Sequence, residues 1–508
     1  MKNKIILLSE RGYFGILLFF FGLLSSLGYA PFHLFPLTIL SYLLAIYIFI
    51  LSNRSNIHIF YFGFIFSLGS HLGLLYWIAI SFKTANMGGY FAGSIAVLLL
   101  CCFLSCFTAL SFYFLFKYFK HKKGLIFGTA FTFIFSFFDW AKGNILWGFP
   151  WTPISSIWSF SSITLYPFSV FGVWGYSLIT YLFIISLYYL FFSFKKFLLF
   201  IFPIFFSILF LPKIINSPED NIGEINVRIV QPNIKQEDKW SKDKIKENYE
   251  KLTTLINTEY DESFDLIILP ETAVSFDIIE LAKKNRLQNF GLDHTENLIL
   301  GAIRREEKTG SISIFNSMFL INNNFEKVYY HDKLKLVPFG EFMPLRKFFG
   351  LEKLSPGSLD FTSGKNANYL TLASNIKILP LICYEVLFPH LVKSISGEYN
   401  LIVNITNDAW YKKSSGPYQH FSLSKIRAVM EGTSMIRSAN TGISGIIGSD
   451  GNILAKLDLE QEGVIDYKLN LRSIKTVYNN YGNSLFILIM LTLLFVICNS
   501  VFYRKNKS

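Results

Sequence analysis

The chain has 508 residues, of which 52% are hydrophobic, 18% are aromatic and only 16% are charged. Soluble domains average about 25% charged residues, so this composition excludes an ordinary soluble protein, and it also excludes a disordered or collagen-like chain. The net charge is +12, but residues 213–482 hold 32 Lys+Arg against 33 Asp+Glu, so the basic excess lies in the apolar rest of the chain. The charge therefore does not indicate nucleic-acid binding.

In that remainder the basic residues flank hydrophobic runs, a pattern that is typical of membrane proteins. A helix needs about 20 apolar residues to cross the hydrocarbon layer. We therefore predict eight transmembrane helices, of which the first two and the seventh are short. They lie at residues 12–29, 34–52, 58–81, 88–116, 124–141, 166–193, 197–212 and 484–503.

Lysine and arginine in the short loops predict the orientation of these helices, because they favour the cytoplasmic side. With the N-terminus inside, the predicted cytoplasmic segments hold thirteen of them, whereas the outer short loops hold only Lys83 and Lys142. This bias predicts two cytoplasmic termini. It also predicts a membrane domain of seven helices at 1–212, an extracytoplasmic domain at 213–482, and the eighth helix with its tail at 483–508.

The polar region 213–482 has the pattern of an α/β domain. Continuous apolar strands separated by helices predict sheets that are buried on both faces. Helical patterns lie between the strands, for example at 242–257 and 421–435. The predicted strands lie at 225–231, 266–269, 298–303, 313–321, 378–383, 401–405 and 443–448.

Of the five cysteines only Cys383 lies in the polar region. It has no second cysteine there for a disulfide, and no Cys/His cluster has the spacing of zinc ligands. We therefore expect no metal. Two interpretations of Cys383 remain, a thiol that is used in chemistry and a buried strand residue. The other cysteines are interpreted as small core or lipid-facing residues: Cys101, Cys102, Cys106 and Cys498.

Three reactive side chains lie at strand ends or in rigid loops. Cys383 ends one apolar run, Glu271 follows another directly after Pro270, and Lys333 lies in an apolar segment punctuated by Pro and Gly. Folds of the α/β class place their sites at the carboxyl ends of strands. Each residue also has a purely structural interpretation: Cys383 as a buried strand residue, Glu271 as a helix cap and Lys333 as a solvated surface lysine.

Together these three groups form a chemical set. A thiol needs a base to become a nucleophilic thiolate. Glu271 can be that base if desolvation raises its pKa, and the Lys333 ammonium can stabilise a tetrahedral oxyanion. We therefore predict that Cys383 is the nucleophile, Glu271 the base and Lys333 the oxyanion stabiliser.

The segments around these residues resemble the three signatures of the nitrilase superfamily, which has a Glu-Lys-Cys triad and an αββα sandwich. With the eight spans and the other motifs, nearly the whole chain is similar to the bacterial apolipoprotein N-acyltransferase family. This implies a nitrilase-like domain inserted between the seventh and eighth helices. The matching segments are Leu269-Pro270-Glu271, 333–341, Ile382-Cys383-Tyr384-Glu385, 231–234, 148–151, 407–410, 416–420 and 437–442.

The resemblance implies an N-acyltransferase of the bacterial inner membrane with a periplasmic catalytic domain. It would transfer an acyl chain from a phospholipid to the N-terminal amine of an S-diacylglyceryl-cysteine apolipoprotein, giving the mature triacylated lipoprotein. Its partners would be these two substrates and the bilayer, with no cofactor and no nucleic acid, and we expect a monomer. The triad predicts a ping-pong mechanism through a thioester on Cys383.

The resemblance also implies roles outside the triad. Glu341 and Glu385 match positions that support Lys333 and the thiol, with ordinary loop salt bridges as the alternative. Two positions depart from the family: His331 stands where a Tyr is usual and Lys335 where a His is frequent, so hydrogen bonding around Lys333 can differ. Substrate contacts are expected from aromatic residues whose alternative is packing or an interfacial belt, namely Phe149, Trp151, Trp240, Tyr384 and Trp410.

Two other functions remain as alternatives. A membrane-tethered nitrilase-type amidase that hydrolyses small amides would share the triad, although the eight spans favour a lipid substrate. A transporter or receptor with an outer ligand-binding domain is the second alternative. Asp139 is the only acidic residue within the apolar spans, so an ion or proton path has few candidates.

Overall fold

The computed structural model forms two compact units. It describes residues 13–51, 55–122, 124–192, 208, 210, 216, 220–258, 263–283, 295–308, 311–323, 328–344, 359–366, 368–372, 374–394 and 398–505. Unit 1 comprises Met1–Ile78, Ser94–Ser217 and Thr476–Ser508. Unit 2 comprises Ala79–Gly93 and Pro218–Lys475, so a short segment between two apolar helices groups with the polar domain.

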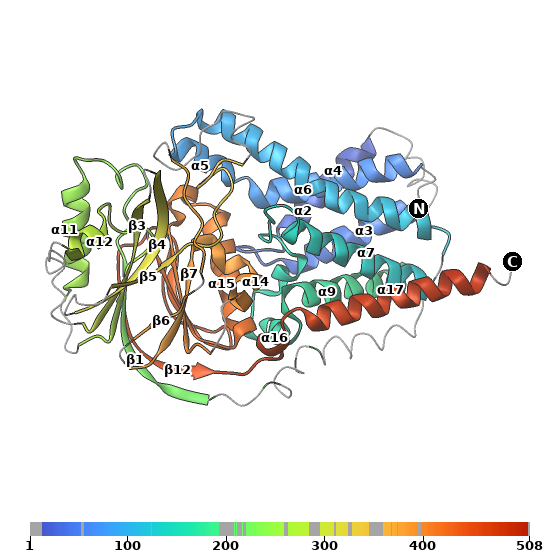
Figure 1. Cartoon of the computed structure of the whole chain (residues 1–508). Helices are drawn as coiled ribbons and strands as arrows, with labels where there is room; N and C mark the ends of the chain where they lie inside the picture. The colour runs from blue at the N-terminus through green and yellow to red at the C-terminus, as the bar shows by residue number, and fades with distance from the viewer. Residues whose placement is uncertain are drawn as a thin grey trace. The chain divides into compact units, whose positions relative to one another are not determined.

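Unit 1 is built from apolar helices, which Figure 1 shows running alongside one another. Seven of the eight predicted spans contain such a helix, and the run 197–212 lies outside the described residues except for two positions. Among the described residues, four helices are long and apolar enough to cross a membrane, namely α4, α6, α7 and α9. The helices are α2 (Tyr13–Ser26), α3 (Phe35–Leu51), α4 (Asn56–Leu75), α6 (Gly89–Phe119), α7 (Leu125–Asn144), α9 (Phe168–Phe192) and α17 (Ser484–Lys505).

An internal ion pair fixes the segment after α7. Asp139 lies 2.9 Å from Lys142, which donates to the carbonyl oxygen of Thr152, and both charged side chains are buried. Gly148 has φ of 67°, and a side chain there would clash with the carbonyl oxygen of Gly143. The one acidic residue of the apolar spans is therefore engaged in holding a turn.

The described part of unit 2 forms two six-stranded sheets. The first has the order β12-β1-β2-β3-β4-β5 and the second β11-β10-β9-β8-β7-β6. The strands are β1 (Asp220–Gln231), β2 (Leu266–Ile268), β3 (Asn297–Lys308), β4 (Ser311–Asn322), β5 (Val328–Asp332), β6 (Leu370–Thr371), β7 (Lys377–Ile382), β8 (Leu401–Thr406), β9 (Met435–Ala439), β10 (Ser444–Ile447), β11 (Ile453–Leu457) and β12 (Gly463–Ser473).

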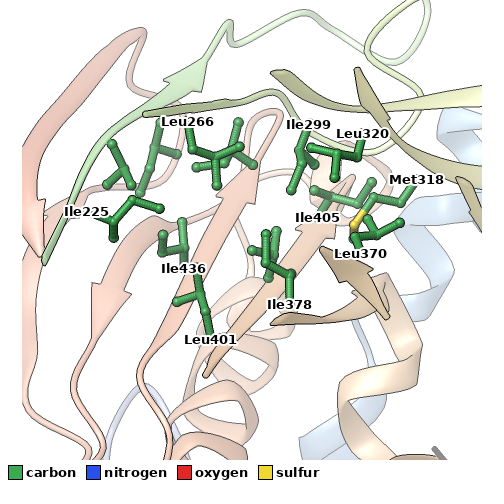
Figure 2. Close-up of a cluster of buried hydrophobic side chains, with 14 of the residues drawn as sticks. Ile225, Leu266, Ile299, Met318, Leu320, Leu370, Ile378, Leu401, Ile405 and Ile436 are labelled. Carbon is green, nitrogen blue, oxygen red and sulfur yellow. The ribbon is translucent and has the colours of Figure 1, made fainter. Parts of the chain in front are cut away.

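Apolar side chains from both sheets meet in one buried layer. Figure 2 shows Ile225 and Leu320 of the first sheet beside Ile378 and Ile436 of the second. Alternate residues of the first sheet lie on its outer face, away from the buried layer, and pack against α11 (Ile245–Ile256) and α12 (Ile278–Lys283). The second sheet is contacted by α15 (Ser415–Glu431), which packs against β9 (Figure 1). The predicted αββα sandwich is therefore confirmed.

Several predicted elements need correction. The helix expected at 421–435 begins at Ser415, because Ser414 caps it, and ends at Glu431, because Gly432 takes the left-handed conformation. Met435 instead begins β9. The sheets are also mixed, since β3, β4 and β5 pair antiparallel, as do β9, β10 and β11. In its described part, unit 2 also contains the short α-helices α5 (Ile78–Thr84, whose first residue belongs to unit 1) and α14 (Pro389–Ser394) and two 3₁₀ helices.

Candidate active site

Glu271 and Lys333 meet through a direct ion pair. The Lys333 ammonium lies 3.2 Å from one Glu271 carboxylate oxygen and 2.9 Å from a Glu341 carboxylate oxygen. All three residues are buried, with Lys333 only 1% exposed. Glu271 follows β2 and Lys333 follows β5, so two strand ends of the first sheet supply the pair. The structure thus brings one base candidate, one cation and one predicted supporting carboxylate together.

Asn316, in the middle of β4, bridges the two carboxylates. Its side-chain amide donates to Glu271 at 2.7 Å and to Glu341 at 2.9 Å. Its main-chain carbonyl oxygen accepts from the backbone N–H of Lys333 at 2.8 Å. One buried amide therefore fixes both carboxylates and the start of the lysine loop.

Cys383 lies at the end of β7 and begins the short 3₁₀ helix η4 (Cys383–Leu387). Its φ is 52°, a left-handed conformation that is uncommon for a residue with a side chain. Such strain costs about 1–3 kcal/mol and persists only where the surroundings hold it. The residue is 8% exposed.

Glu385 connects the turn of Cys383 to the loop of Lys333. One carboxylate oxygen accepts from the backbone N–H groups of Leu334 and Lys335, at 2.6 and 3.1 Å. The other accepts from the backbone N–H of Ile382 at 2.8 Å. Because these N–H groups flank the triad lysine and cysteine, Glu385 sets the distance between the two loops.

A buried polar network lies behind Cys383. His420 Nε2 lies 3.2 Å from the Cys383 carbonyl oxygen, and its Nδ1 lies 2.9 Å from Asp408. Asp408 in turn pairs with Arg437 at 2.8 Å and accepts from Thr406 at 3.1 Å. The Cys383 sulfur and single ligand atoms of Asp408 and His420 lie within 4.8 Å of one another. The guanidinium already neutralises Asp408, so this cluster does not suit a cation.

Burial raises the pKa of the Cys383 thiol far above its ordinary value, the Glu271 carboxylate adds to this effect, and Lys333 opposes it. Burial also acts to raise the pKa of Glu271. Lys333, the Asn316 hydrogen bond and Lys239 outweigh burial, so the pKa of Glu271 is lowered. The sequence suggested Glu271 as the base on the condition that desolvation raises its pKa, and the nearby cations lower that pKa instead. The resting pair is therefore a neutral thiol beside an ionised carboxylate.

Lys333 remains charged. Burial alone would lower its pKa, but Glu271, Glu341 and Cys383 raise it well above the ordinary value. An ammonium has three N–H donors, and the two carboxylates take two of them. Among the residues that the structure describes, no acceptor takes the third N–H, which can therefore serve a developing oxyanion.

The predicted substrate-side aromatic residues are divided between the units. Tyr384 follows Cys383, is buried and packs edge-on against Phe388, with ring centroids 4.8 Å apart. Trp240 is half-buried and lines a cavity beside Ile234.

Trp410 is half-buried, and its carbonyl oxygen accepts from Thr84 of the 79–93 segment at 3.4 Å. Phe149 and Trp151 lie in unit 1, where the two rings stack at 6.5 Å and Trp151 packs against Trp77. Substrate contact by all five of these aromatic residues stays a prediction.

The two departures from the family pattern lie beside Glu385. His331 is 1% exposed, and its Nε2 lies 3.8 Å from a Glu385 oxygen, beyond hydrogen-bond distance. Lys335 lies over the Phe388 ring at 4.8 Å, and burial lowers its pKa. Neither side chain takes a hydrogen-bonding role at Lys333 itself among the described contacts.

The sequence patterns predicted neither Asn316 nor the Asp408–Arg437 pair as part of the site, and they assigned His420 no catalytic role. A polar residue inside an otherwise apolar strand was the available signal for Asn316. Asp408 and Arg437 lie in matching motifs, but nothing in their spacing indicated that they meet behind Cys383.

Two family models match the chain. The apolipoprotein N-acyltransferase N-terminal domain matches residues 21–186, and the carbon-nitrogen hydrolase family matches residues 226–479. Apolipoprotein N-acyltransferase of Rickettsia prowazekii is 34% identical over 497 residues, which cover 94% of this chain and 95% of that protein. The Rickettsia typhi protein of the same name is 34% identical and covers 92% and 94%. Among solved structures, Saccharomyces cerevisiae Nit3, a nitrilase superfamily member, is 19% identical, with a TM-score of 0.37 and coverage of 49% and 91%.

Proposed function

Since the chain belongs to the apolipoprotein N-acyltransferase family, we propose that it acylates lipoproteins through a thioester on Cys383. It is an N-acyltransferase that acts on lipoproteins with a phospholipid as donor. The observation that supports the thioester is the buried ion pair of Glu271 and Lys333 acting on the Cys383 thiol. The acceptor is the N-terminal amine of S-diacylglyceryl-cysteine, and the product is the triacylated lipoprotein.

In the first half-reaction the Cys383 sulfur attacks the ester carbonyl of the phospholipid. The Glu271 carboxylate takes the thiol proton as the carbon–sulfur bond forms, because the raised pKa of the thiol disfavours a free thiolate beforehand. The free N–H of Lys333 stabilises the oxyanion. The ester carbon–oxygen bond breaks, Glu271 returns the proton to the leaving oxygen, and lysophospholipid departs.

In the second half-reaction the lipoprotein amine attacks the thioester carbonyl. Glu271 takes a proton from the attacking nitrogen as the carbon–nitrogen bond forms. The carbon–sulfur bond breaks, and Glu271 delivers that proton to the departing sulfur. Glu341 keeps Lys333 in place through both steps, because its other oxygen is fixed by the backbone N–H of Val337.

The thermodynamics of lipid transfer supports a membrane-embedded enzyme. Extracting an acyl chain into water costs about 0.8 kcal/mol per CH₂. An enzyme that is itself embedded in the membrane avoids this cost, because the phospholipid donor and the lipoprotein acceptor both stay anchored in the bilayer. We place the chain in the bacterial inner membrane as a monomer, with both termini cytoplasmic and residues 213–482 periplasmic between the seventh and eighth of eight helices. The charge bias of the loops supports this orientation.

The proposal is tested with purified protein in lipid nanodiscs that contain phosphatidylethanolamine and a diacylated lipopeptide. Mass spectrometry should find the peptide heavier by one acyl chain on its N-terminal amine. The product should disappear in each of the variants Cys383→Ala, Glu271→Gln and Lys333→Met. The control is Cys101→Ala, which replaces a free cysteine of unit 1 and should still form the product. A Cys383→Ala protein with full transfer overturns the mechanism, and hydrolysis of small amides in place of transfer points to the amidase.

A further inference from the structure

Lys239 is a buried lysine beside the triad that the mechanism above does not use. It lies in the segment 235–240, is 7% exposed, and its ammonium nitrogen donates to the main-chain carbonyl oxygen of Glu271 at 2.9 Å. Within the described residues no carboxylate oxygen lies within 4 Å of that nitrogen. Lysine is almost never buried without a charged partner, so this position calls for an explanation.

The surroundings of Lys239 favour its uncharged form. Burial lowers its pKa to about 7, although the charges of Glu271 and Cys383 act in the opposite direction. The other titratable group on the same cavity wall is Tyr249, whose pKa is raised by burial. Near neutral pH the ε-amine of Lys239 is therefore partly free to accept a proton.

The second half-reaction needs such an acceptor. An α-amine has a pKa of about 7.7–8.0, so at neutral pH most of the lipoprotein substrate arrives as an ammonium ion. That ion must lose one proton before it can attack and a second as the amide forms. Glu271 takes the second proton and passes it to the Cys383 sulfur, so the first proton needs another base.

We propose that Lys239 is this base: its neutral amine takes the first proton from the acceptor ammonium and makes the attacking amine. This inference rests on the proposed thioester mechanism. The resulting Lys239 ammonium remains hydrogen-bonded to the Glu271 carbonyl oxygen and passes its proton to solvent before the next cycle. A cavity of about 20 Å³, enough for one water, lies against Lys239 and Trp240 and offers the first step of that route.

The two half-reactions separate this role from a structural one. Acylation of Cys383 by phospholipid, measured at pH 7 as lysophospholipid release without acceptor, should fall much less than transfer in Lys239→Met, because Lys333 and Asn316 still lower the pKa of Glu271. Transfer from the isolated acyl-enzyme to the diacylated lipopeptide should be about tenfold slower at pH 7, because only about a tenth of the α-amine is then uncharged. The loss should disappear by about pH 9, where the acceptor supplies its own free amine.

A conservative variant and a second nucleophile sharpen the test. Lys239→Arg keeps a charge and a donor for the Glu271 carbonyl oxygen but cannot accept a proton, so it should show the same pH-dependent loss as Lys239→Met. Hydroxylamine is mostly uncharged at neutral pH, so it should cleave the acyl-enzyme at the parent rate in both variants. Lys425→Met replaces a half-buried lysine on α15 and serves as the control with parent behaviour.

Each outcome decides a separate point. Full transfer by Lys239→Met at pH 7, recovery in Lys239→Arg, or equal loss with hydroxylamine overturns the role of Lys239. If the parent protein forms no acyl adduct on Cys383 at all, the thioester mechanism itself has failed and Lys239 is not the cause. Melting temperatures of both variants, measured in the same nanodiscs, show whether a loss comes from unfolding.

Discussion

His420 Nε2 lies 3.2 Å from the main-chain carbonyl oxygen of Cys383, so a fully buried imidazole on α15 holds the residue that carries the nucleophile. Because a carbonyl oxygen can only accept, the imidazole donates this bond. Cys383 has φ of 52°, and the bond helps to hold that strained turn. His420 therefore acts through the position of Cys383 and needs no part in proton transfer.

Replacing His420 with Ala should slow acylation of Cys383 about 10- to 100-fold, because losing a hydrogen bond in a buried site costs about 1–3 kcal/mol. Single-turnover release of lysophospholipid measures the rate. Ser422→Ala removes a buried hydroxyl from the same helix and should leave the rate unchanged. Parent-like acylation in His420→Ala contradicts the positioning role.

Asn316→Asp should move the pH dependence of the reaction. The substitution removes a hydrogen-bond donor from Glu271 and places a negative charge beside it, so the pKa of Glu271 rises. The ascending limb of kcat/KM against pH should shift upward by about one unit, with a larger loss at acid than at alkaline pH. Asn322→Asp, at the end of the same strand, is the control. A uniform loss at every pH indicates a structural defect instead.

Asp408 should stabilise the fold in a pH-dependent way. Burial acts to raise its pKa, but His420 and Arg437 lower it to about 2. A group with a depressed pKa contributes stability above its unfolded value of about 3.9, and that contribution is lost as the pH falls through about 2.

Asp408→Asn should lower the free energy of unfolding by about 3–5 kcal/mol at neutral pH, because Arg437 is left buried without its partner. The difference from the parent should shrink between about pH 4 and pH 2. Denaturant titration of the detergent-solubilised protein measures both effects. Asp458→Asn, whose ion pair with Lys456 is exposed, should change the stability little. An equally large difference at the lowest pH contradicts this account.

Glu385→Gln should impair both half-reactions equally, because Glu385 fixes the distance between the Cys383 turn and the Lys333 loop. The amide keeps one acceptor oxygen but cannot accept from both loops, so we expect a loss of about 100-fold in kcat, about 2.7 kcal/mol. Rapid-quench measurements of acylation and of transfer check this result. The exposed Glu398→Gln is the control, and a loss confined to one half-reaction would argue against a shared positioning role.

The triad could be predicted from the sequence because Glu271 and Cys383 follow apolar runs, Lys333 lies in an apolar loop punctuated by Pro and Gly, and the three groups have complementary chemistry. Glu271, Lys333 and Cys383 each come from a separate loop, and strand order in an α/β fold brings such ends together. The supporting Glu341 could be named from the same signature segment. These inferences need only local pattern and residue type.

The missed features depend on contacts between residues far apart in the chain. Strand β12 pairs with β1 along its whole length, although more than 200 residues separate them, and no local pattern reports that partner. Asn316 became a site residue because the register of β4 turns its amide toward two carboxylates. Burial acts to raise the pKa of Glu271, but Lys333, Asn316 and Lys239 together lower it, and of these three the sequence placed only Lys333 at the site.

The acyl-enzyme tests the central claim most directly. The protein is incubated with a phospholipid of defined acyl chain and no acceptor, then digested and analysed by mass spectrometry. We predict a mass increase of that one chain on Cys383, sensitive to hydroxylamine, absent in Glu271→Gln, and lost when diacylated lipopeptide is added. An unmodified Cys383 in a preparation that still acylates the lipopeptide contradicts the account.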